Sequence, residues 1–148
     1  MATPKYFTFA EMIRSRTAKD LGIDNTPAWE EIDNLRDLCE NILDPLRAAY
    51  GKRTRVSSGF RCERLNKAVG GSKTSVHKRG SAADLQPMED TFDNFRNFVV
   101  AWFKATGTKF DQILLERDKR TGELWIHIGQ YNNSGQQRGI IRIMEVNG

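Results

Sequence analysis

The sequence predicts a single α+β domain with helices packed on one side of a small antiparallel sheet. Two observations support this prediction. Apolar residues recur at intervals of three and four over residues 29–50 and again over residues 92–107, which is helical spacing. The last third of the chain instead alternates apolar and polar residues, as strands do. Helices followed by strands in this order are typical of the α+β class.

The first half of the chain predicts two helices and a short strand. A helix over residues 7–22 is capped by Thr8, and a longer one spans residues 29–50. Pro45 lies inside the second helix and should kink it near Asn41 or start a new turn, because proline lacks the amide hydrogen that a helix interior needs. The short strand is expected at residues 55–59, and further elements are expected at 62–69, 82–85, 92–107, 112–116, 124–129 and 139–146, with a turn at 118–122.

The length and composition indicate one ordinary globular domain. A chain of 148 residues, with 39% hydrophobic and 28% charged residues, is long enough to bury its own core, and we take residues 1–148 as one domain. No apolar run approaches the ~20 residues of a membrane span, and the first residues lack the apolar segment of a secretory signal. We therefore expect a monomer that does not insert into membranes and is cytoplasmic as synthesised.

The charge and the cysteines give weaker signals. The net charge of +4 suits either a nucleic acid or an anionic cell-wall polymer as the partner. The basic residues are scattered, with the densest group at residues 52–55, so we expect no nucleic-acid partner and keep nucleic-acid binding as a rival. Cys39 lies in the helical pattern as a small buried hydrophobe, and Cys62 has no partner at metal-binding spacing.

The most informative residues are the only two histidines, His77 and His127, together with Asp84. Each histidine lies beside an apolar, strand-like run. Two imidazoles and one carboxylate give Zn²⁺ three protein ligands and leave a fourth position for water, as in catalytic zinc sites. The spacing is far less restrictive than the helical His-Glu-x-x-His motif, so a structural role for each residue is the alternative. The residues alone indicate a candidate zinc hydrolase.

Such a hydrolase needs a group that moves a proton to the leaving amine, and Glu116 and Glu123 are the candidates. If the chain turns at residues 118–122, Glu116 comes opposite Trp125 and shares a strand face with His127. Glu123 has the same parity but lies four residues from His127, roughly 13 Å along a strand. We favour Glu116, whose alternative interpretation is a surface charge on a hairpin.

A series of ordered motifs carries a family resemblance. It comprises Ser57-Ser58-Gly59-Phe60-Arg61, Asn66, Val69-Gly70-Gly71-Ser72, Ser75-x-His77-x-x-Gly80-x-Ala82-x-Asp84, Phe110-Asp111-Gln112-Ile113-Leu114-Leu115-Glu116 and Trp125-Ile126-His127-Ile128. Over about residues 28–143, the core of the domain, the chain resembles the zinc D-alanyl-D-alanine carboxypeptidases and the related endolysin peptidases. These are the LAS metallopeptidases, and the resemblance is to a domain of the peptidase M15 type.

The resemblance implies a Hedgehog/DD-peptidase-like fold in which His77, Asp84 and His127 hold Zn²⁺. It implies hydrolysis of amide bonds in peptidoglycan stem peptides or cross-links, by a carboxypeptidase or an endopeptidase of the phage or prophage endolysin type. It also places Arg61 near the substrate carbonyl or carboxylate, where a guanidinium stabilises negative charge.

Two more residues are expected around the metal, and one departs from the family pattern. Ser75 should line the pocket and bind the substrate backbone, and Gln112 shares a strand face with Glu116. Many relatives have an acid three residues before the second histidine, where this chain has Leu124. This departure supports an alternative function, a non-catalytic module that keeps the fold and the metal but binds cell wall or a protein.

Overall fold

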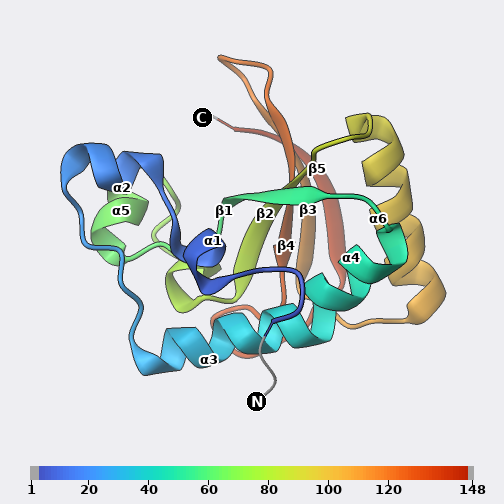
Figure 1. The fold of residues 1–148 in the computed structure, drawn as a ribbon, viewed down its shortest axis with the longest axis horizontal. Helices are drawn as coiled ribbons and strands as arrows, with labels where there is room; N and C mark the ends of the chain where they lie inside the picture. Colours follow the sequence, from blue (N-terminus) through green and yellow to red (C-terminus); the bar gives the residue numbers. More distant parts are fainter. Residues whose placement is uncertain (1–3, 147–148) are drawn as a thin grey trace.

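A computed structural model of the protein describes residues 4–146 and shows helices around a five-stranded mixed sheet, which confirms the predicted α+β class (Figure 1). The helical elements are α1 (Phe9–Ile13), α2 (Arg16–Leu21), α3 (Trp29–Leu38), the π-helical turn η1 (Cys39–Leu43), α4 (Asp44–Tyr50), α5 (Glu63–Ala68), the 3-10 turn η2 (Val76–Arg79) and α6 (Phe92–Thr106). The strands are β1 (Thr54–Ser58), β2 (Ala82–Pro87), β3 (Gln112–Asp118), β4 (Leu124–Gly129) and β5 (Ile140–Val146).

The first helix differs from its prediction. The expected helix over residues 7–22 is split into α1 and α2, because Arg14 is extended and Ser15 starts a new helix. The Thr8 hydroxyl caps α1 as expected, accepting the Glu11 amide at 3.1 Å. The Ser15 hydroxyl accepts the Ala18 amide at 3.1 Å in the same way. A serine side chain that satisfies a free backbone amide favours a helix start over a helix interior.

The long helix passes through Pro45 without ending. The turn before it, η1, is π-helical, and the Asp44 amide donates to the Cys39 carbonyl, five residues back. A proline ring would collide with the carbonyl four residues earlier, and the wider turn makes room for it. Cys39 is buried in this stretch, as expected, and burial raises the pKa of its thiol to about 12.

The sheet has the strand order β1-β2-β4-β3-β5 and is antiparallel except for the β3–β5 pair, which is parallel. The sequence predicts an antiparallel sheet throughout, so β5 departs from that prediction. Both edges of β4 are already paired, and the chain leaving Gly129 pairs instead with the free edge of β3. It enters beside Gln112, where β3 begins, and therefore runs parallel to β3. Arg138 fixes this crossing by a bidentate pair with the buried Asp111, at 2.7 and 3.0 Å.

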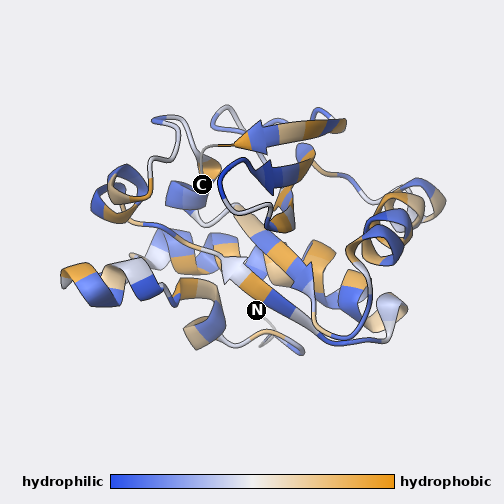
Figure 2. Cartoon of the chain, turned by 90° about the horizontal axis from the view of Figure 1, so that it is seen from above, coloured by the Kyte–Doolittle hydropathy of each residue, from blue (hydrophilic) through white to orange (hydrophobic). Residues whose placement is uncertain are grey.

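One face of the sheet packs into the hydrophobic core, and the other face carries polar side chains. Hydrophobic and hydrophilic positions alternate along the strands (Figure 2). One face packs on α1, α3, α4 and α6 and contributes a row of buried apolar residues to the main core: Val56, Ala83, Leu85, Ile113, Ile126 and Ile128. The opposite face carries Asp84, Glu116 and His127, whose positions alternate with those of the core residues.

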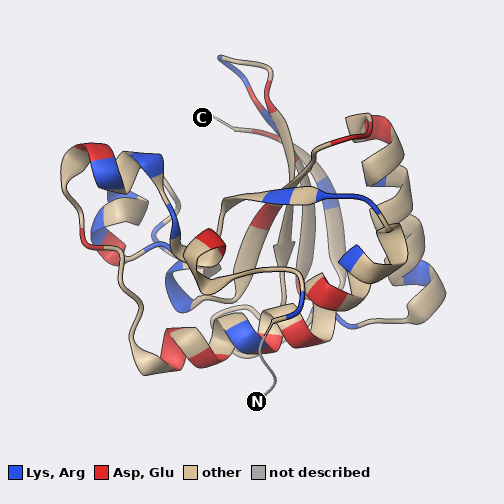
Figure 3. Ribbon diagram, viewed as in Figure 1, with Lys and Arg blue, Asp and Glu red and all other residues tan. Residues whose placement is uncertain are grey.

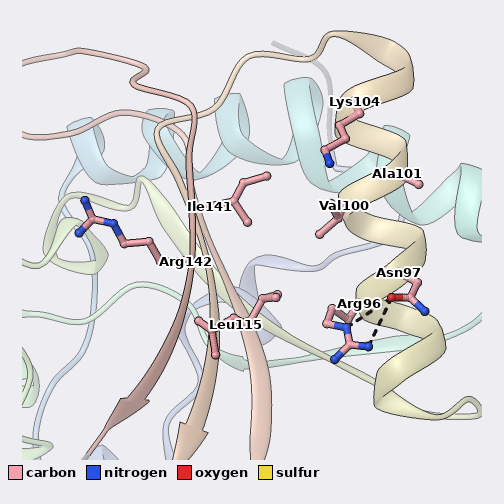
Figure 4. Close-up of a pocket in the computed structure, with 9 residues that line it drawn as sticks. Arg96, Asn97, Val100, Ala101, Lys104, Leu115, Ile141 and Arg142 are labelled. Atoms are coloured by element: carbon pink, nitrogen blue, oxygen red, sulfur yellow. Dashed lines mark hydrogen bonds between the residues drawn. The ribbon is translucent and has the colours of Figure 1, made fainter.

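A pocket of about 690 Å³ lies between α6 and the outer strands, β3 and β5. In it, Leu115 and Ile141 project toward the helix, whereas Arg142 points to the other side of β5 (Figure 4). The sheet separates this pocket from Asp84 and His127. No helix among residues 4–146 is long and apolar enough to cross a membrane.

A substitution of the buried Phe95 tests how much the core contributes to stability. The Phe95 ring is fully buried and packs at a tilt against Tyr50, with ring centroids 5.1 Å apart. We expect Phe95→Ala to lower the free energy of unfolding by about 3–5 kcal/mol, because the loss of a buried ring leaves a cavity. Denaturant unfolding measures this loss. Trp29→Ala is the control, since Trp29 is 79% exposed, and an equal loss in both variants would contradict this account of the core.

Candidate metal centre

Three separate elements bring His77, Asp84 and His127 together. Asp84 on β2 and His127 on β4 are directly opposite in the antiparallel pair, so both project from the same face. His77 comes from η2, in the segment that leads into β2. The His77 Nε2, His127 Nδ1 and Asp84 Oδ1 atoms form a triangle with sides of 3.2, 3.2 and 3.0 Å. All three residues are buried, with 8% of the surface of Asp84 and of His127 still exposed.

A close backbone contact fixes which nitrogen of His77 faces this triangle. His77 Nδ1 lies 2.7 Å from the carbonyl oxygen of Gly59. A carbonyl can only accept, so Nδ1 carries the hydrogen and Nε2 presents its lone pair. The Gly59 backbone lies against the Met12 carbonyl, with which a β-carbon at position 59 would collide. Glycine is therefore required for the approach that orients His77.

The donor set fits a zinc ion. Zinc bonds to nitrogen and oxygen of ~2.0–2.1 Å in a tetrahedron place neighbouring ligand atoms about 3.3 Å apart. The observed sides, 3.0–3.2 Å, are close to that value. In their metal-binding forms all three atoms are lone-pair donors, which repel one another unless a cation or a proton lies between them. His77, Asp84 and His127 are thus the residues that would hold Zn²⁺.

The electrostatics of the cluster keep negative charge on the carboxylate. Burial raises the pKa of Asp84, but the two histidines act more strongly and hold that pKa well below its usual range. Burial also lowers the pKa of His77, against the influence of Asp84. Burial acts in the same direction on His127, but its contact with Asp84 and the charge of Glu116 raise the pKa of that imidazole overall.

Glu116 lies on the same sheet face, beside this cluster. It pairs with Trp125 across the β3–β4 hairpin, and the Trp125 Nε1 donates to Glu116 Oε1 at 3.1 Å. Burial and the negative charge of Asp84 raise the pKa of Glu116, while His127, Trp125 and Arg61 act in the opposite direction. The indole therefore orients a half-buried carboxylate. Strand alternation alone indicates that Trp125 shares this face, but not that it binds the carboxylate.

Arg61 is held beside the cluster by its backbone. Its amide donates to the His77 carbonyl at 3.1 Å. On either side, the Asn25 side chain donates to the Phe60 carbonyl at 3.0 Å and accepts the Cys62 amide at 2.7 Å. Sequence reasoning missed Asn25, because its position in a polar loop gives no sign of these distant contacts. The Nε of Arg61 is buried without a hydrogen-bond partner, so this guanidinium keeps a donor for a ligand.

The other predicted site residues have more local contacts. The Ser75 hydroxyl accepts the His77 amide at 3.3 Å and caps η2, and its own hydrogen remains available to a substrate. Gln112 lies on the face of Glu116, opposite Gly129 at the far end of the hairpin. Glu123 is exposed and accepts from Gln86 Nε2 at 2.8 Å, outside the cluster. Of the two candidate bases, the structure brings only Glu116 to the metal centre.

Comparison with known proteins agrees with this geometry. Residues 5–119 match the family model described as Peptidase M15. The matched segment includes Arg61, His77, Asp84 and Glu116, whereas His127 lies beyond its end. A search of curated proteins gave no match.

Metal analysis tests the centre directly. We expect the purified protein to bind about one Zn²⁺ per chain, and His77→Ala to weaken binding by more than about 100-fold, since even the loss of a residue that orients a ligand lowers affinity about 10–100-fold. Elemental mass spectrometry and competition with a chelator measure both. Glu116→Gln is the matched control and should keep its zinc, because Glu116 is not part of the triangle. Unchanged affinity in His77→Ala would contradict the ligand assignment.

Proposed function

Since the chain belongs to the peptidase M15 family, we propose that it is a zinc-dependent peptidase that hydrolyses amide bonds in peptidoglycan stem peptides or cross-links. We further propose that it acts as a wall-degrading enzyme of the phage or prophage endolysin type. The observation that carries this proposal is the convergence, over one face of the sheet, of three metal ligands, a half-buried carboxylate and an arginine whose Nε has no hydrogen-bond partner.

The residues divide the reaction between them. A bound zinc ion supplies Lewis acidity, which makes the attacking water more acidic and polarises the scissile carbonyl. Glu116 accepts the proton of the attacking water and delivers it to the leaving nitrogen. Glu116 has to act first as a base toward water and then as an acid toward the leaving nitrogen. Its raised pKa makes the carboxylate a stronger base, and the protonated carboxyl is still acidic enough to release the proton. Arg61 stabilises the negative charge that develops on the carbonyl oxygen.

The substrate class rests on the motifs and on charge. The Ser-Gly-Phe-Arg segment at residues 58–61 and the Ser-x-His segment at 75–77 resemble peptidases that act on D-amino acid peptides. The net charge of +4 attracts the protein to a wall rich in anionic polymers. The motifs favour peptidoglycan over an unrelated protein substrate, and the charge is compatible with peptidoglycan.

Digestion of purified peptidoglycan tests the function. We expect the zinc-loaded protein to release peptide fragments, and mass spectrometry of the products to identify the bond that is cut. A chelator should stop the release, and added zinc should restore it. Glu116→Gln should reduce the rate about 10²–10⁴-fold with zinc still bound, as expected for loss of a general base. Glu123→Gln is the matched control and should retain activity.

Several outcomes would contradict this proposal. Zinc binding without release of any fragment would favour the non-catalytic module. If Glu116→Gln kept full activity and Glu123→Gln lost it, the general base would be Glu123 instead of Glu116.

The pH profile tests the pairing of Trp125 with Glu116. Glu116 must be ionised to accept a proton, so activity falls as the pH drops through its raised pKa. The Trp125 N–H lowers that pKa, and Trp125→Phe removes it while keeping an aromatic ring. We therefore expect the acidic limb of kcat/KM to move to higher pH by about one unit, because hydrogen bonds to charged groups contribute about 1.5–3 kcal/mol. Trp102→Phe, on α6, should leave the limb in place. An unmoved limb in Trp125→Phe would show that the indole does not act on the base.

A further inference from the structure

A second pocket, of about 710 Å³, lies between the α1–α2 segment and β1. Its walls are unusually basic. Five of the lining residues carry positive charge: Arg14, Arg16, Lys19, Arg55 and Arg61. Asp20 is the one acidic residue that lines it, and Arg16 lies 3.8 Å from that carboxylate. Figure 3 shows basic positions at the start of α2 and along β1, two of the elements that line this pocket. We name it the cationic pocket.

Most of this positive charge is not neutralised within the protein. Among residues 4–146, Arg14, Lys19 and Arg55 form no ion pair with a carboxylate. The buried Nε of Arg61 has no hydrogen-bond partner either. Like charges gathered around one concave surface repel one another and raise the local concentration of anions. Guanidinium groups with free donors bind carboxylates through paired hydrogen bonds. The chemistry of the pocket is therefore that of an anion-binding site.

The cationic pocket adjoins the metal centre, because Arg61 lines the pocket and also lies near Asp84 and Glu116. Ser58, in its wall, is paired with Asp84 across the β1–β2 register. Ser57 Oγ lies 3.4 Å from the Asp84 carbonyl oxygen. Arg55 pairs with Gln86, which lies on the face of β2 that carries Asp84. A ligand in the cationic pocket therefore lies alongside the catalytic face of the sheet rather than at a separate place on the surface.

We propose that the cationic pocket is a substrate subsite that binds carboxylate groups of the peptide, on the part of the substrate that extends from the scissile bond over β1. This inference rests on the proposed function and adds a substrate preference to it: peptides with free acidic side chains or free α-carboxylates, over the same peptides with those groups amidated. A carboxylate is favoured over a phosphate because the pocket shares Arg61 with the proposed peptidase centre.

Binding to an inactive holoenzyme tests the subsite independently of turnover. Zinc-loaded Glu116→Gln is titrated calorimetrically with a synthetic stem peptide that bears two free carboxylates, and with the same peptide amidated at both. We expect the acidic peptide to bind about 10-fold or more tightly, with the difference shrinking as salt is added. The added double substitution Arg14→Gln and Arg55→Gln should abolish the difference. The matched control, Lys104→Gln and Lys109→Gln, removes the same charge elsewhere and should preserve it.

Three outcomes would overturn the subsite. Equal binding of the two peptides, or an equal effect of both double substitutions, would show that only net charge matters. The pocket would belong to another ligand if inorganic phosphate or a DNA duplex bound more tightly than the acidic peptide and if the Arg14 and Arg55 variant lost that binding. Cleavage of both peptides by the wild type without preference would refute the subsite and leave the peptidase. Selective binding without any cleavage would instead support the subsite and refute the proposed function.

Discussion

Three lone-pair donors held within 3.2 Å of one another are the constraint on which the rest of this structure depends. In their metal-binding forms such atoms repel one another unless a cation or a proton lies between them, so the fold holds each of them by a contact outside the cluster. Asp84 and His127 are held by the register of adjacent strands, and His77 by the carbonyl of Gly59. A β-carbon at position 59 would collide with the Met12 carbonyl and displace the backbone that holds His77. The orientation of the His77 ligand therefore requires a glycine at position 59.

The residues that stabilise the fold and the residues of the metal centre lie on opposite sides of the sheet. Its inner face supplies apolar residues to a core closed by the long helices, and its outer face supplies Asp84, His127 and Glu116. Because strand residues alternate between faces, a ligand and a core residue are neighbours in sequence, as Asp84 and Leu85 are. The rigid inner packing fixes the backbone from which the polar side chains project. A catalytic site needs this rigidity, because small displacements of its groups reduce the rate strongly.

The sequence predicted best those features that depend on local periodicity. The hairpin, and with it the shared face of Glu116 and His127, follows from alternation and one turn. The break at Arg14 was missed because Ser15 is a helix cap only when the chain before it turns away. The parallel β5 was missed because its direction depends on which strand edges are already occupied. The contacts of Asn25 join residues 35 and 37 positions away, and no pattern in a single sequence indicates them.

The ligands of the metal centre come from distant parts of the chain, and 43 positions separate Asp84 from His127. An ion bound by both closes that stretch into a loop, in the way that a reversible crosslink does. An ion that binds the folded site but not the unfolded chain stabilises the fold by mass action, by about 4 kcal/mol when its free concentration is about 1,000 times its Kd. A bound metal would therefore crosslink the tertiary structure as well as supply chemistry. The supply of zinc would set how much of the protein survives unfolding and proteolysis, not only how fast it works.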